Sequence, residues 1–161
     1  MAEPAFTKST FDDYKARLIK ISADTDRQWG SMDATQMLRH LRFVFEASMG
    51  EVDTRGQAAP GMGFLAYIPG ARQLGYLMAF KWFTDWPKGK LKAPDEWMPA
   101  ADNAYDEEEK LLLKKMNQFV AELEDTPEKR AFSPLLGDIP LTKWSVVHGV
   151  HMNHHLKQFG V

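Results

Sequence analysis

Four segments of the chain carry apolar residues at the spacing of an amphipathic α-helix, and this pattern limits the folds open to it. The predicted helices cover residues 9–23, 33–49, 102–125 and 142–159. Asp33 and Gln36 form a capping-box pattern at the start of the second helix, and Thr142 is the expected cap of the last. No strand-like alternation extends over a useful length, so we expect an all-α fold.

The connection between the second and third predicted helices is long and broken by glycine and proline. Residues 50–70 are rich in both, and residues 86–99 combine prolines with an excess of lysine. Between them, residues 71–83 are apolar on most sides and predict a short helix that packs over the others. We expect one domain over residues 1–161, an antiparallel four-helix bundle with this extra short helix in a long crossover.

Composition excludes several classes of protein. The chain has 161 residues, 44% of them hydrophobic, and a net charge of −2 without a basic stripe, which argues against a nucleic-acid partner. Pro69, Arg72 and Lys81 interrupt the apolar residues 62–83, so no membrane-spanning helix is expected. The first residues hold no apolar run of signal-peptide length, and we expect a cytoplasmic protein.

The histidines are the one group that suggests chemistry. His151 and His155 are four residues apart in the last predicted helix, so their imidazoles can point at one ion from a single face. His40, on the apolar face of the second helix, is the only histidine outside that segment and is the candidate third ligand. With no cysteine in the chain, a soft-metal site must use imidazoles, and three ligands leave a position for water.

Other interpretations of these residues stay open. His148 falls within about 60° of His151 and His155 around the helix, so it is an alternate ligand or a residue that supports the ligands. His154 lies about 100° from His155 and is expected at the periphery. A lone histidine such as His40 is more often a hydrogen-bonded core residue, and the whole face can also be partly exposed and simply titrate.

Two segments resemble the DinB-like superfamily. Residues 151–158, His-Met-Asn-His-His-Leu-Lys-Gln, are similar to its His-x-x-x-His signature, which is followed by a basic residue and a glutamine. Residues 29–40, from Trp29 to His40, resemble the segment that carries the family's first metal histidine. Residues 86–94 and the ending His-His-Leu-Lys-Gln-Phe-Gly resemble an uncharacterised branch, so the likeness covers nearly the whole chain.

The resemblance implies a four-helix bundle, often a homodimer, in which His40, His151 and His155 bind a divalent metal, commonly nickel or zinc. Characterised relatives include S-transferases that use low-molecular-weight thiols, a thiol-dependent maleylpyruvate isomerase and metal-dependent hydrolases. One departure concerns the position after the last ligand, where many relatives have arginine and this chain has Leu156. Gln158 either orients a ligand, touches substrate or is an ordinary polar residue near a helix end.

We therefore expect a metal-dependent enzyme in which water or a low-molecular-weight thiol is activated for hydrolysis or S-transfer on a small substrate. No catalytic side chain can be named, because Glu46 lies about 120° around its helix from His40. Aromatic residues either line the pocket mouth or pack in the core: Tyr67, Tyr76, Trp82, Phe83 and Trp86. The alternative function is a non-catalytic metal-binding or interaction bundle.

Overall fold

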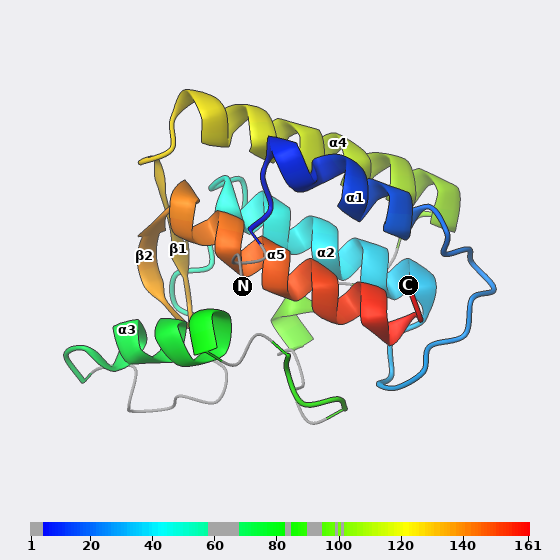
Figure 1. Ribbon diagram of the computed structural model, residues 1–161, viewed down its shortest axis with the longest axis horizontal. Helices are drawn as coiled ribbons and strands as arrows, with labels where there is room; N and C mark the ends of the chain where they lie inside the picture. The colour runs from blue at the N-terminus through cyan, green and yellow to red at the C-terminus, as the bar shows by residue number, and fades with distance from the viewer. Residues whose placement is uncertain (1–4, 58–67, 83–84, 90–94, 99, 101) are drawn as a thin grey trace.

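The computed structural model describes residues 5–57, 68–82, 85–89, 95–98, 100 and 102–161 (Figure 1). Its α-helices, in chain order, are α1 (Lys8–Leu18), α2 (Ala34–Ser48), α3 (Ala71–Tyr76), α4 (Tyr105–Asp125) and α5 (Leu141–Gln158). Alongside these are a π-helical turn η2 (Leu77–Trp82), a 3₁₀ turn η3 (Asp95–Trp97) and the strands β1 (Arg130–Ser133) and β2 (Gly137–Pro140).

Local chemistry explains where the two histidine-bearing helices start. The Asp33 side chain accepts from the Gln36 backbone N–H at 2.8 Å, and the Gln36 side chain accepts from the Asp33 N–H at 2.9 Å. This reciprocal pair satisfies amides that the first turn of α2 leaves unbonded, as the sequence predicts. The prediction that Thr142 caps α5 was wrong, because Pro140 occupies that position and the helix follows β2 without a side-chain cap.

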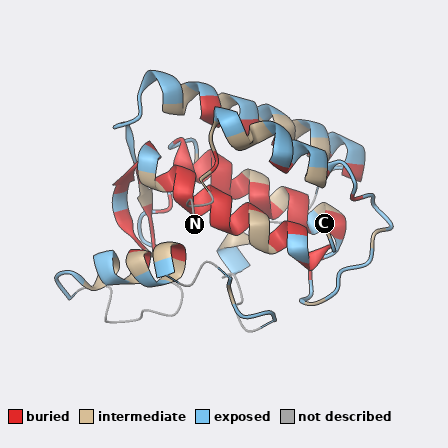
Figure 2. Cartoon of the chain, viewed as in Figure 1, coloured by how far each residue is buried: buried red, intermediate tan, exposed pale blue. Residues whose placement is uncertain are grey.

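The four long helices pack around one apolar core. In Figure 1, α2 and α5 lie side by side, with α1 and α4 running along one side of them. Helix α2 packs against α4 and α5, and α1 packs against the same two helices. Buried residues are densest on α2 and α5 (Figure 2), where the histidines also lie. The helical majority of the prediction is confirmed.

A two-stranded antiparallel hairpin precedes α5, so the purely all-α prediction was wrong. Strands β1 and β2 pair from Arg130 opposite Pro140 to Ser133 opposite Gly137. Each strand has only four residues, too few for an alternation that a sequence pattern can detect. Gly137 has φ of 79°, a conformation that favours glycine in a tight connection. The hairpin is joined to α5 by the Trp144 indole, which donates to the Ala131 carbonyl at 3.2 Å.

The short helix predicted over residues 71–83 is present through Trp82, and it changes from α-helix to π-helix at Leu77. It buries Tyr76 and Phe80 but leaves an apolar stripe in solvent, with Leu74, Met78 and Trp82 exposed by 50%, 45% and 61%. The prediction that it packs over the other helices therefore holds for one face only. No helix in the described part of the chain is both long and apolar enough to cross a membrane.

Candidate metal centre

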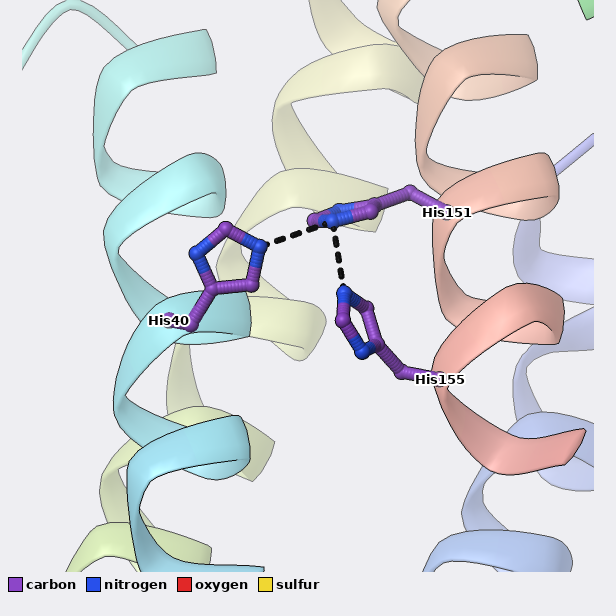
Figure 3. A group of neighbouring side chains, drawn as sticks. All are labelled: His40, His151 and His155. Carbon is purple, nitrogen blue, oxygen red and sulfur yellow. Dashed lines mark hydrogen bonds between the residues drawn. The ribbon is translucent and has the colours of Figure 1, made fainter. Parts of the chain in front are cut away.

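Three buried histidines from two helices converge on one point. His40 comes from α2, and His151 and His155 come from successive turns of α5, with their rings pointing toward one another between the helices (Figure 3). His151 Nε2 lies 2.9 Å from His40 Nε2 and 3.0 Å from His155 Nε2. One nitrogen from each ring lies within 4.8 Å of the other two. These three histidines are close enough to bind a metal ion.

The proton of His40 is placed by a backbone carbonyl. His40 Nδ1 lies 2.6 Å from the carbonyl oxygen of Trp97, in the turn η3. A carbonyl oxygen only accepts, so the His40 ring carries its hydrogen on Nδ1 and donates it to Trp97. In the neutral ring, Nε2 then presents a lone pair to the centre of the cluster.

His155 is held in the same tautomer by a side-chain amide. His155 Nδ1 lies 2.8 Å from Gln158 Oε1, and the amide is oriented by its Nε2, which donates to the Trp29 carbonyl at 2.7 Å. The Gln158 oxygen therefore faces His155 and accepts the Nδ1 hydrogen. The lone pair of His155 Nε2 points at the centre of the cluster, like that of His40.

These tautomers leave the middle histidine unable to satisfy both neighbours. His151 Nε2 carries at most one hydrogen, and two Nε2 lone pairs face it at hydrogen-bonding distance. At least one of the two short contacts therefore has no hydrogen between its nitrogens, and at least one of the inward-facing lone pairs is left without a donor. A cation among the three nitrogens removes this conflict, because each lone pair then has an acceptor of its electrons. The donor set fits a divalent metal ion.

The distances agree with this fit. Two imidazole nitrogens bound to a tetrahedral zinc ion at about 2.0–2.1 Å are separated by about 3.3 Å. The two short nitrogen–nitrogen distances, 2.9 and 3.0 Å, differ from that value by only a few tenths of an ångström. The nitrogens of the third pair, His40 and His155, lie within 4.8 Å of each other.

Burial keeps the cluster neutral. Removal from water lowers the pKa of His151 and His155 well below the ordinary value of 6.5, and the neighbouring histidines lower the pKa further. Burial also lowers the pKa of His40, against a smaller opposite effect of its hydrogen bond to Trp97. Neutral imidazole is the form that binds metal, so the protein holds all three rings ready for an ion near neutral pH.

His148, the predicted alternate ligand, lies outside this cluster. Its Nε2 is 2.8 Å from the hydroxyl of Ser48, and its ring stacks on Phe45 with centroids 3.8 Å apart and planes 6° from parallel. Burial lowers the pKa of His148 to about 3, so it too is neutral. It is a core residue between α2 and α5.

Gln158, the second residue predicted to support the ligands, is held tightly against His155. Gly30 lies beside it with φ of 87°, and a Cβ at Gly30 would collide with Gln158 Nε2. Only glycine both adopts this backbone conformation readily and leaves space for the amide. The loop before α2 is thus shaped around a residue that orients His155 in the three-histidine cluster.

His154 and the flanking aromatic residues border the cluster. The half-buried His154 ring lies between the rings of Trp29 and Trp86, at centroid distances of 6.2 and 5.4 Å. Trp86 also contacts His151, at 6.0 Å. Of the aromatic residues predicted at a pocket mouth, Trp86 therefore lies beside the cluster and Tyr76 is buried, while Tyr67 and Phe83 lie outside the described residues.

Glu46 is committed to an ion-pair network on the α4 side of α2. Its carboxylate binds Arg42 at 2.7 Å and Arg39 at 3.5 Å. Arg42 also binds the fully buried Glu108 through two hydrogen bonds of 2.8 and 3.0 Å. This network ties α2 to α4. It gives the three-histidine cluster no carboxylate base from Glu46, in agreement with the angle expected from the helical spacing.

Two contributors to the centre were missed by sequence reasoning. The carbonyls of Trp97 and Trp29 set the orientation of His40 and of Gln158. Every residue has a carbonyl, so neither residue type signals this role.

Comparison of the chain with protein-family models, with curated proteins and with solved structures finds no match.

Proposed function

We propose that the protein binds a divalent metal ion, nickel or zinc, at His40, His151 and His155, and is a metal-dependent enzyme of the DinB-like type. The observation that carries the proposal is the convergence of three buried Nε2 atoms. Those of His40 and His155 present lone pairs, because the hydrogen of each ring is on Nδ1 and is donated to Trp97 or Gln158. A chain that needed these histidines only for packing would have no reason to hold their lone pairs against one another.

The fold supports the same proposal. Four-helix bundles build metal sites from side chains on facing helices, and here the ligands come from α2 and α5. In the DinB-like architecture that we propose, α1, α2, α4 and α5 are the bundle. Helix α3 and the turns η2 and η3 belong to the long crossover, and the β1–β2 hairpin lies in the connection before α5.

The residues of the chain prepare and orient the ligands. Trp97 and Gln158 accept the Nδ1 hydrogens, which fixes the rings of His40 and His155 and increases the electron density at Nε2. Three protein ligands leave room for a small molecule, and a bound metal lowers the pKa of a water or thiol in that place. We propose hydrolysis or S-transfer with a low-molecular-weight thiol on a small substrate.

The first experiment is elemental analysis of untagged protein, comparing the wild type with His40→Ala, His151→Ala and His155→Ala. About one equivalent of nickel or zinc is expected in the wild type and none in the three variants. His154→Ala is the matched control, since it removes a neighbouring histidine of the same helix and should retain the ion. A wild type that binds no metal after supplementation contradicts the proposal.

A second measurement separates an enzyme from the alternative, a non-catalytic metal-binding protein. Cobalt-substituted protein is titrated with 2-mercaptoethanol, and the visible absorption spectrum reports whether a thiolate binds the ion. A new thiolate-to-metal band means that a small ligand reaches the metal, as the catalytic proposal requires. An unchanged spectrum favours the non-catalytic alternative, and either result decides whether screening thiol transfer and hydrolysis is worthwhile.

A further inference from the structure

Trp29 differs from the other tryptophans in the partner of its indole N–H. Three of them donate to acceptors in the chain: Trp86 to the Ala79 carbonyl at 2.7 Å, Trp97 to Gln57 at 2.7 Å and Trp144 to the Ala131 carbonyl at 3.2 Å. Trp82 is exposed to water. The Trp29 Nε1 atom is buried and, within the described part of the chain, has no hydrogen-bond partner.

A buried donor without an acceptor destabilises the folded state, so native proteins rarely leave one. An N–H group that the chain itself does not satisfy is a reason to look for a ligand there. Trp29 lies next to the proposed metal centre, because its carbonyl accepts a hydrogen bond from Gln158, which in turn orients His155. The free donor is therefore part of the loop that supports the metal centre.

Aromatic rings connect Trp29 to the cluster. The Trp29 ring contacts His154, His154 contacts Trp86, and Trp86 contacts His151, at centroid distances of 6.2, 5.4 and 6.0 Å. Trp86 is fixed by its hydrogen bond to Ala79 in the π-helical turn η2. Such turns are rare in proteins overall, and where they occur they often lie at functional sites. These rings give an apolar surface that ends at a proposed metal ligand.

A positive charge lies at the Trp29 end of this surface. The ammonium of the exposed Lys88 lies 4.6 Å from the centre of the Trp29 ring. Lys157 is paired with Asp85 at 3.0 Å, and the Asp85 carboxylate also interacts with Lys88 and His154. Lys88 lies over the face of the indole, while the N–H points out from the edge of the ring; its long, flexible side chain can bring the ammonium to a negative group bound at that N–H.

We propose that Trp29, His154, Trp86 and Lys88 form a subsite for a small organic carboxylate next to the metal centre. One carboxylate oxygen accepts from Trp29 Nε1–H and faces Lys88, and the apolar body of the molecule lies against Trp86 and His154. One N–H and one ammonium suit a monoanion, whereas a phosphate dianion calls for more donors. The inference rests on the proposed function, because this carboxylate belongs to the substrate of the metal centre.

The test uses benzoate as the probe and the indole N–H signals of ¹⁵N-labelled protein, in zinc-loaded and in chelator-treated samples. Trp29→Phe assigns the Trp29 signal and removes the donor while keeping a ring. We expect benzoate to shift the Trp29 signal, and its Kd to rise about tenfold in Trp29→Phe, as for a lost hydrogen bond to a charged group. Lys88→Gln, a change at an exposed residue, should also weaken binding, and Trp82→Phe should not.

Metal content is measured on the same samples, so that the two proposals fail separately. Zinc bound with no shift of the Trp29 signal overturns the subsite and leaves the metal site standing. The subsite is equally overturned if Trp29→Phe and Lys88→Gln both bind benzoate as tightly as the wild type, since the probe then binds elsewhere, for example to the ion. If the protein takes up no zinc when zinc is supplied, and benzoate still shifts the Trp29 signal, the result supports the subsite and contradicts the proposed function.

Discussion

His148 and His155 lie on the same helix and are both buried and neutral, yet they carry their hydrogen on opposite ring nitrogens. Ser48 donates its hydroxyl hydrogen to the Phe45 carbonyl, so the hydroxyl oxygen accepts from His148, and His148 carries its hydrogen on Nε2. His155 carries its hydrogen on Nδ1, against Gln158, and keeps the Nε2 lone pair free. Burial is shared, and the tautomer is what differs.

The difference comes from the residues that α2 presents to each part of α5. Opposite His148 it presents the hydroxyl of Ser48 and the ring of Phe45, which satisfy and cover the imidazole. Two turns earlier along α2 it presents His40, whose lone pair adds to that of His155. We therefore expect metal binding at His155, where Gln158 holds the second nitrogen and other imidazoles face the first, and not at His148.

The largest effect should come from breaking one half of this comparison and leaving the other intact. His151→Ala should abolish metal-dependent stabilisation, which for the wild type reaches about 4 kcal/mol when the free metal is about 1,000 times its Kd. His148→Gln should lower the stability of the metal-free protein but keep the full stabilisation by metal. Thermal unfolding with and without zinc measures both. If His148→Gln lost the stabilisation by metal to the same extent as His151→Ala, His148 would belong to the metal site.

The contact between His155 and Gln158 offers a subtler change. Gln158→Leu removes the acceptor of the Nδ1 hydrogen and frees the ring to rotate or change tautomer. Metal affinity should fall about 10–100-fold, the usual effect of losing a group that orients a ligand. Competition with a chromophoric chelator measures it. Lys157→Gln, one residue away in an ion pair on the surface, is the control and should bind metal like the wild type.

The sequence carried much of the helical fold and the identity of the three clustered histidines. Helical spacing alone places His151 and His155 on one face, and it places Gln158 three residues beyond His155, within reach of its ring. The same spacing places His148 on that face too, so it could not separate a ligand from a core residue. That distinction depends on Ser48, which belongs to another helix and shows no recognisable motif.

Other features depend on contacts between distant segments. The Trp97 carbonyl meets His40 across 57 residues of sequence, and any residue at that position supplies the same oxygen. The β1–β2 hairpin is too short to produce a detectable pattern, although Gly137 marks its turn. The stripe on α3 and η2 was expected to be covered, but it is exposed. Apolar spacing shows which residues share a face of a helix, but it does not show whether another element packs against that face.

Ser48→Ala sharpens the comparison from the His148 side. The change leaves the Nε2–H of His148 buried without an acceptor, which should lower the free energy of unfolding by about 1–3 kcal/mol. Denaturant unfolding of metal-free protein measures this loss, and metal affinity should be unchanged because the cluster keeps all its partners. The double variant Ser48→Ala, His148→Phe should recover part of the stability, since it removes the donor as well. No recovery would argue against the hydrogen bond as the cause.

The pH dependence of stability separates His148 from the carboxylates. Burial lowers the pKa of His148 in the folded protein to about 3, while in the unfolded chain it is about 6.5. Above pH 6.5 both states are neutral at this residue. As the pH falls from about 6.5 toward 3, His148 becomes protonated in the unfolded chain but stays neutral in the folded protein. Stability therefore falls, by about 1.4 kcal/mol per pH unit for this residue.

That slope can be isolated with the variants already described. In metal-free protein, the free energy of unfolding of His148→Phe in the Ser48→Ala background should fall less steeply between pH 6 and pH 4.5 than that of the Ser48→Ala single variant. The difference should be about 1.4 kcal/mol per pH unit. Carboxylates titrate in the same range, but they are common to both proteins and cancel in the comparison. Equal slopes would mean that His148 takes up a proton in the folded state, so that its place among Phe45 and the other core residues is open to water.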